Sequence, residues 1–401
     1  MPVQTVDMPY TDKNFLRMYY SIFEKSVQAR KMGMEFSDNT CYTVCITHSG
    51  GSEMLKLPAL PPHMRQASEK QKGQNWFVEL LIFFLVFLVA STTSSFIMIP
   101  GIVIAVFSDK SILEQFTGGA PSDIGHIAAR IESSVPVTIF MLFANAGLIL
   151  IAILFCVVLQ RRKLASMGIV KEKALTQYLI GLGIGFALFA GAVLLNVITG
   201  SMKLTGISPR FSIGLFLLFA LGFMIQGMAE EVLCRGYLLV SVARRYPVSI
   251  AVFLNSLVFA LLHLGNPGVS LLAVVNILLV GVFLSLYFLR TGNIWGVGAI
   301  HTMWNFAQGN IFGMEVSGME LSCSILESSA VPHKTFWNGG SFGPEAGFTC
   351  TIIYIAAILL VLLWKNKKAD AEAQGCSHSL TVHGNEETPP HTGNGADKRL
   401  R

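Results

Sequence analysis

Residues 226–239 read QGMAEEVLCRGYLL and place two carboxylates and a guanidinium at the end of an apolar run that begins near Phe211. Charged side chains inside a membrane helix are costly and are usually kept for a function. Glu231 and Arg235 are four residues apart, so a helix brings them to one face, where they can pair. Glu230 points about 100° away from Glu231 and is not neutralised by Arg235. The stretch therefore predicts one carboxylate used for structure and one free for chemistry.

The composition predicts a membrane protein. Of the 401 residues, 52% are hydrophobic and only 13% are charged, whereas soluble domains are about 25% charged. The net charge of +5 is small and is spread over the loops, which excludes a nucleic-acid partner from the expected functions. Membrane lipid and a membrane-associated peptide or protein substrate are the partners that we expect.

The apolar runs predict an all-α, polytopic membrane helix bundle with about eight transmembrane helices, since ~20 residues cross a bilayer. They cover residues 76–107, 135–159, 178–199, 211–242, 248–264, 270–289, 294–313 and 347–364.

Three parts of the chain follow from these runs: an N-terminal cytoplasmic extension (1–75), a transmembrane domain (76–364) and a C-terminal cytoplasmic tail (365–401). The extension is predicted to be weakly ordered and the tail to be disordered, because neither contains an apolar run. In the third run, Gly181 and Gly185 form a small-xxx-small pair that predicts close contact with another helix.

The loop charges predict the orientation, because basic residues collect on the cytoplasmic side. With the N-terminus inside, most basic residues fall on the inner segments: Arg65, Lys70, Lys72, Arg161, Arg162, Lys163, Lys171, Lys173, Arg244, Arg245, Arg290, Lys365, Lys367 and Lys368. The outer segments hold only Lys110, Arg130, Lys203, Arg210 and Lys334. We therefore expect a multi-pass protein of the cell membrane with both termini in the cytoplasm.

Three polar pairs stand inside apolar helices, and each closes at a spacing of four residues, which places it on one helix face. The pairs are Glu230-Glu231-x-x-x-Arg235, Phe259-x-x-x-His263 and His301-x-x-x-Asn305. A carboxylate beside an imidazole can take a proton from water and make it a nucleophile. Histidine and asparagine on another helix can stabilise an oxyanion. Each pair alone is compatible with helix packing, but together they are the parts needed for amide hydrolysis.

In this order, the three motifs resemble the motif set of the CPBP family. This is the CAAX protease and bacteriocin-processing family, also called the Abi family, and it includes the Ras-converting CAAX endopeptidase. The resemblance covers about residues 210–310, the CPBP-like catalytic core, and extends to Thr291-Gly292-Asn293-Ile294-Trp295. It implies an intramembrane glutamate endopeptidase.

The resemblance also implies a role for each motif residue. Glu230 is then the general base, and His263 helps to position and activate the water. His301 and Asn305 line the oxyanion site. The remaining motif residues support the structure: Glu231, Arg235 and Phe259.

Several alternatives stay open. No cofactor or metal is expected, but Glu230, His263 and His301 are a possible zinc-ligand set, which would make the protein a metalloprotease. The resemblance implies a prenylated CAAX tail as the substrate of the eukaryotic relatives, and bacteriocin or peptide-signal processing in bacterial ones. The rival functions are a non-enzymatic self-immunity or scaffold protein of the same fold and a proton-coupled transporter. Cys323 and Cys350 lie on the predicted outer side, where a disulfide or two free thiols fit equally well.

Overall fold

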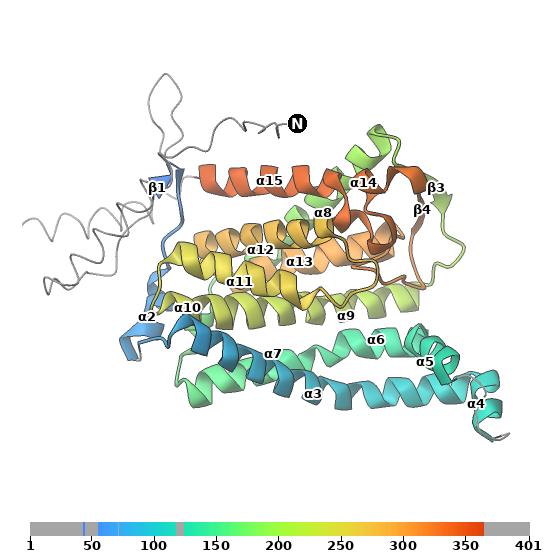
Figure 1. The fold of residues 1–401 in the computed structure, drawn as a ribbon, viewed down its shortest axis with the longest axis horizontal. Coiled ribbons are helices and arrows are strands. Elements are labelled where there is room, and N and C mark those ends of the chain that lie inside the picture. The colour runs from blue at the N-terminus through green and yellow to red at the C-terminus, as the bar shows by residue number, and fades with distance from the viewer. Residues whose placement is uncertain (1–42, 45–54, 71, 118–123, 365–401) are drawn as a thin grey trace, which may run out of the picture. The chain divides into compact units, whose positions relative to one another are not determined.

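The structure is a computed structural model, and it describes residues 43–44, 55–70, 72–117 and 124–364. The predicted tail and most of the predicted N-terminal extension lie outside the described residues. Within the described part the chain is a bundle of apolar helices with two short antiparallel strand pairs (Figure 1). The helical membrane bundle expected from the sequence is confirmed.

Eight helical segments of the described chain correspond to the eight predicted spans. They are α3 (Trp76–Ser108), α6–α7–η1 (Val135–Ala144, Ala146–Leu154, Phe155–Leu159), α8 (Ala174–Ile198), α9–η3–α10 (Ile213–Glu231, Val232–Leu239, Val240–Ala243), α11 (Val248–Leu262), α12 (Leu271–Thr291), α13–η4 (Ile294–Phe306, Ala307–Ile311) and α15 (Phe348–Leu363). By length and composition, five segments are able to cross a membrane: those containing α3, α6–α7, α8, α9 and α12. Helices α11 and α15 are shorter but also apolar.

Helix α8 contacts α13 directly through its backbone. A Cβ atom added to Gly181 would lie 2.3 Å from the carbonyl oxygen of Gly296, and one added to Gly185 would lie 2.5 Å from that of Ile300. Only glycine permits such a close approach, so the predicted small-xxx-small contact is confirmed. Because α13 carries both polar residues of the third motif, this contact helps to set their position in the bundle.

The end of the bundle where α10 meets α11 is closed by a helix that the sequence did not predict, α2 (Pro62–Lys70). Leu60, Met64 and Ala67 are buried in the main core, and His63 hydrogen-bonds the carbonyl oxygen of Gly292 at 2.9 Å. Part of the predicted N-terminal extension, residues 60–70, therefore packs on the bundle in this structure. The spacing of the three apolar residues suits a helix face, but that face is stabilised only by the bundle against which it packs.

We call this the basic end, because basic residues of the described inner segments lie here, among them Arg162, Arg244 and Arg245. Glu79 of α3 and Arg244 form a buried ion pair there, with 2.9 Å between Oε1 and Nη2. Arg162 is also buried and donates to the hydroxyl of Ser241 and to the carbonyl of Gly236. These bonds tie α3, α10 and the loop after η1 together.

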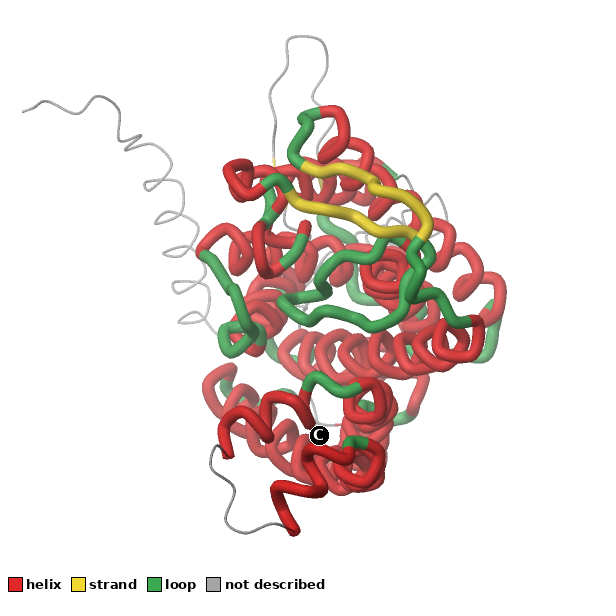
Figure 2. Tube along the Cα trace, turned by 90° about the vertical axis from the view of Figure 1, so that its right-hand side faces the viewer, coloured by secondary structure: helices red, strands yellow, loops and turns green. Residues whose placement is uncertain are grey.

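The opposite end carries the loops, and we call it the loop end. Strand β3 (Met202–Ile207) pairs antiparallel with β4 (Leu326–Ala330), as Figure 2 shows in yellow. The turn after α11 packs on residues 313–347, where Asn266 Nδ2 donates to the Ser317 carbonyl at 3.2 Å. The short elements of this region are η5 (Pro332–Lys334), α14 (Thr335–Asn338), η6 (Gly340–Phe342) and η7 (Pro344–Ala346).

The remaining described elements are α4 (Lys110–Thr117), α5 (Ile124–Glu132), η2 (Leu164–Met167), β1 (Thr43–Val44) and β2 (Leu55–Lys56). Cys323 and Cys350 are free, buried thiols in separate core clusters. The disulfide that the sequence left open is therefore not formed in this structure.

We expect Gly185→Leu to destabilise the bundle, because the new side chain would enter the backbone contact between α8 and α13. Overpacking of this kind costs about 1–3 kcal/mol, which should lower the melting temperature of the detergent-purified protein. Gly183→Leu is the matched control, since a Cβ atom at Gly183 meets nothing within 4 Å. Equal melting temperatures for the two variants would contradict the close packing.

Candidate active site

The two carboxylates of the first motif are the last residues of α9, and the helix continues as the π-helical segment η3. Such π-turns occur frequently at functional sites. Arg235 lies within η3, and its Nη1 donates to Glu231 Oε1 at 2.7 Å. Both side chains are fully buried. The pairing expected from the four-residue spacing is thus present.

Arg235 also contacts the two helices that follow in the chain. Its Nη2 donates to the Gly281 carbonyl of α12 at 3.2 Å. Its guanidinium carbon lies 4.5 Å from the centre of the Phe259 ring of α11, a cation–π distance. Phe259 is buried, which suits the supporting role that the family resemblance implies for it.

Glu230 differs from its neighbour in exposure and partners. Its side chain is 23% exposed, and its Oε1 accepts a hydrogen bond from Gln226 Nε2. Its Oε2 lies 3.7 Å from His301 Nε2. One oxygen of Glu230 is therefore held by an amide, and the other faces an imidazole and can accept a proton.

His301 lies between the two carboxylates. Its Nδ1 is 2.8 Å from Glu231 Oε1, and an ionised Glu231 offers only acceptors, so Nδ1 donates this bond. A neutral His301 then presents Nε2 toward Glu230 as an acceptor. The buried carboxylate thereby sets both the tautomer and the direction of the ring.

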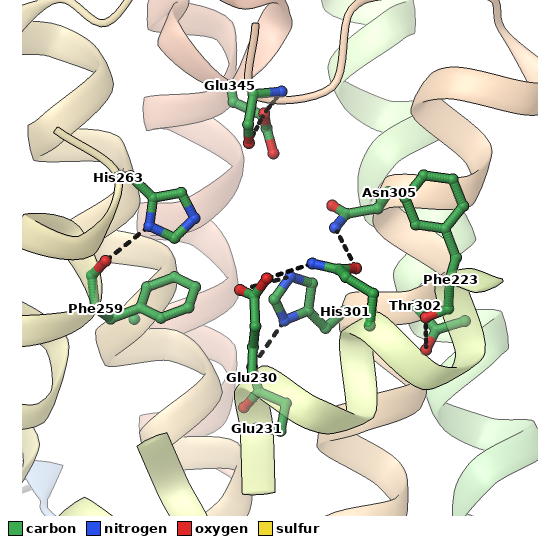
Figure 3. Close-up of polar contacts among 12 residues, drawn as sticks. Phe223, Glu230, Glu231, Phe259, His263, His301, Thr302, Asn305 and Glu345 are labelled. Atoms are coloured by element: carbon green, nitrogen blue, oxygen red, sulfur yellow. Dashed lines mark hydrogen bonds and ion pairs between the residues drawn. The ribbon is translucent and has the colours of Figure 1, made fainter. Parts of the chain in front are cut away.

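His263 is the C-cap of α11. Its Nδ1 is 2.8 Å from the Phe259 carbonyl oxygen and donates to it, which leaves Nε2 free to accept. Figure 3 shows His263 and Asn305 on opposite sides of a common space, with Glu230 below and between them. The structure thus brings together Glu230, His301, His263 and Asn305, the four residues that the sequence nominated for catalysis.

Two further polar residues lie at this site, and neither was assigned a role from the sequence. Gln226 is one helical turn before Glu230, and its Oε1 accepts from Asn305 Nδ2 at 3.0 Å. Its spacing of four residues from Glu230, which places both side chains on one helix face, is the sequence signal that could have identified it. Glu345 of η7 faces the site in Figure 3, with Oε2 held by the backbone and hydroxyl of Ser317 at 2.8 and 2.9 Å. Glu345 lies in a polar loop, and a loop has no periodic sequence pattern from which its packing could be predicted.

Burial around the site is asymmetric. Every residue from 231 to 242 is buried, and this stretch shares one core cluster with residues 283–289 and with Met64 of α2. Gln226, Glu230 and His263 are only partly buried. The site is therefore sealed toward the basic end, and it faces the loop end.

The zinc alternative requires three ligands around one point. Among the residues that the structure describes, no group of three or more His, Cys, Asp or Glu side chains is placed to hold a metal ion. In this arrangement Glu230, His263 and His301 do not fit a three-ligand zinc site.

Together, the fold and the site define a multi-pass helical membrane protein with a carboxylate–imidazole centre inside its bundle. Residues 212–307 match the family model for type II CAAX prenyl endopeptidase Rce1-like proteins, and this segment contains all three motifs. This match supports a relationship of residues 212–307 to the CAAX protease family. No curated protein and no solved structure matches it. The family supports a CAAX-type intramembrane protease in general.

We expect Arg235→Met to be strongly destabilising, because it leaves Glu231 as a buried carboxylate without its cation. Breaking a buried pair in this way costs about 3–5 kcal/mol. The double variant Glu231→Gln, Arg235→Met should recover part of the loss, since no charge then stays uncompensated. Thermal unfolding in detergent measures both, and a double variant less stable than Arg235→Met would contradict this account.

Proposed function

We propose that this protein is an intramembrane endopeptidase in which Glu230 activates the water that attacks the peptide bond. One observation carries the proposal: Glu230 is the partly exposed carboxylate whose free oxygen faces His301, opposite His263 and Asn305. Its neighbour Glu231 is fully buried and engaged by Arg235. Of the two carboxylates, only Glu230 is available to exchange a proton with a water molecule.

The proposed reaction uses these groups in sequence. Glu230 Oε2 takes a proton from water, while the water oxygen forms a bond to the carbonyl carbon of the substrate. The carbonyl π electrons move onto the oxygen, and an N–H of Asn305 stabilises the resulting oxyanion. His263 Nε2 accepts the other hydrogen bond of the water. The proton held by Glu230 passes to the departing amine as the C–N bond breaks.

His301 has a narrower role in this proposal than the family resemblance implies. Glu231 engages its Nδ1, so only Nε2 can reach the reacting atoms. That nitrogen donates to an oxyanion only when the ring carries both protons. We therefore assign Nε2 of His301 to accepting a hydrogen bond from Glu230 once that carboxyl group carries the proton, and retain the oxyanion contact for Asn305.

We expect Glu230→Gln to lower kcat by about 10²–10⁴, the range for loss of a general base. The measurement is cleavage by purified protein of a substrate set that contains prenylated CAAX peptides and apolar membrane peptides. Glu320→Gln is the matched control, because Glu320 is an exposed carboxylate of the loop end. Cleavage by Glu230→Gln at the wild-type rate would remove Glu230 from the chemistry.

A parallel arm with a chelator separates the two types of protease. Activity that survives the chelator supports the metal-free mechanism, whereas activity lost and then restored by added zinc supports the zinc alternative. Cleavage of no substrate by the wild-type protein would favour the self-immunity or scaffold function. Cleavage in detergent without an ion gradient would exclude transport as the sole function.

Orientation decides which substrate class reaches the site. With the basic end in the cytoplasm, as the loop charges predict, both termini are cytoplasmic and the site faces the outside. A peptide exported across the membrane, such as a bacteriocin or a peptide signal, then meets the site directly. A cytoplasmic CAAX tail would require the loop end to lie in the cytoplasm.

We expect a cysteine introduced at Glu320 to react with a membrane-impermeant maleimide in intact cells. A cysteine introduced at Lys163, an exposed residue of the basic end, should react only after the cells are permeabilised. Both changes are made in a background lacking Cys41, Cys45 and Cys376, since the other four cysteines are buried. The reverse labelling pattern would overturn the proposed orientation and favour a CAAX-tail substrate.

A further inference from the structure

Gln226 belongs to none of the three motifs, yet it contacts two of them. It lies on α9, one turn before Glu230, and is partly buried. Its Nε2 donates to Glu230 Oε1, and its Oε1 accepts from Asn305 Nδ2 at 3.0 Å. The Gln226 amide therefore bridges the proposed base on one helix and the proposed oxyanion donor on another.

The bridge has a fixed direction. An ionised Glu230 only accepts hydrogen bonds, so the NH₂ of Gln226 must face it. The carbonyl of Gln226 then faces Asn305, and Asn305 must present its own NH₂ in return. Nδ2 carries a second N–H, which this arrangement leaves for another acceptor. The charge on Glu230 thus determines which way the Asn305 amide points.

We propose that Gln226 is a positioning residue for the hydrolysis proposed above, on which this inference rests. It holds Oε1 of Glu230, so that Oε2 is the oxygen that meets the water. It also holds the Asn305 amide with its nitrogen toward the reacting carbonyl. Gln226 acts through Glu230 and Asn305 and does not itself exchange a proton.

The simpler explanation is that Gln226 only joins α9 to α13. Other contacts already do this, because Thr302 Oγ1 of α13 donates to the Phe223 carbonyl of α9 at 3.2 Å. A Cβ atom at Gly227 would lie 2.6 Å from the backbone nitrogen of Thr302, so the two helices are in close contact beside the bridge. The helix interface is therefore expected to form without Gln226, which makes its variants suitable for kinetics.

The test compares Gln226→Met and Gln226→Glu with the wild type in the cleavage assay. Gln226→Met keeps the length but removes both hydrogen bonds, and we expect kcat to fall by about 10–100-fold with KM changed less than about two-fold, since loss of alignment mainly costs rate. Gln226→Glu keeps an acceptor for Asn305 but places a second carboxylate beside Glu230.

We expect the acid limb of the pH profile of kcat/KM to move upward by about one pH unit or more in Gln226→Glu, because neighbouring carboxylates resist ionising together. Activity should then partly recover at higher pH. The other charged or titratable groups around Glu230 are the same in both variants: Glu231, Arg235, His263, His301 and Glu345.

Thr302→Val is the control for a purely structural role, since it removes a tie between the same two helices and leaves Gln226 intact. It should lower the melting temperature without moving the pH profile. One result would overturn the role of Gln226 and leave the proposed function standing. In that result the wild-type protein cleaves the substrate, Glu230→Gln does not, and both Gln226 variants behave like the wild type. Absence of wild-type cleavage would overturn the proposed function and this inference together.

Discussion

The buried pair between Glu231 and Arg235 is the interaction on which the rest of the site depends. Both side chains are fully buried, so neither charge has water to stabilise it. The guanidinium reaches the Gly281 carbonyl of α12 and the Phe259 ring of α11, and the carboxylate reaches His301 of α13. One charge pair therefore ties the three helical segments that carry the motifs to one another and to α12. Such a pair contributes little net stability but is costly to break, so it favours one arrangement of these helices over others.

The adjacent glutamates have different environments because consecutive residues of a helix point about 100° apart. Glu231 turns toward the core and pairs with Arg235, while Glu230 turns toward His301 and stays partly exposed. His301 contacts both, so the orientation of the ring that faces Glu230 is set by the buried charge behind it. This arrangement links stability to chemistry, because the buried pair of Glu231 with Arg235 fixes the ring that faces Glu230.

The packing of the bundle also limits how a substrate reaches the site. Residues 231–242 are all buried, and helix α2 packs against the same core, so the basic end is closed. His263 lies where α11 ends, next to the turn that packs on residues 313–347. The match of residues 212–307 to the CAAX protease model supports the general reaction, and the proposed direction of this opening, together with the loop charges, bears on which peptides are candidates.

Much of this protein was predictable from local sequence pattern. Apolar runs of membrane length identified the helical segments of the bundle, five of which in the described chain are long and apolar enough to cross a membrane, and glycine spacing identified the contact that α8 makes. The four-residue intervals indicated which polar residues share a helix face, including the pair of Glu231 with Arg235. These features depend on helix periodicity and on the cost of charge in lipid, and both are properties of short segments.

Other features were decided only by the tertiary structure. The bridge from Gln226 to Asn305 joins residues 79 positions apart, and α2 packs as a helix only because the bundle buries its apolar side. The π-helical turn after Glu231, the position of Glu345 and the failure of Glu230, His263 and His301 to surround one point all depend on how the helices tilt and contact one another. Sequence spacing determines the face of a helix on which a side chain lies, but the distance between faces of different helices is set by packing.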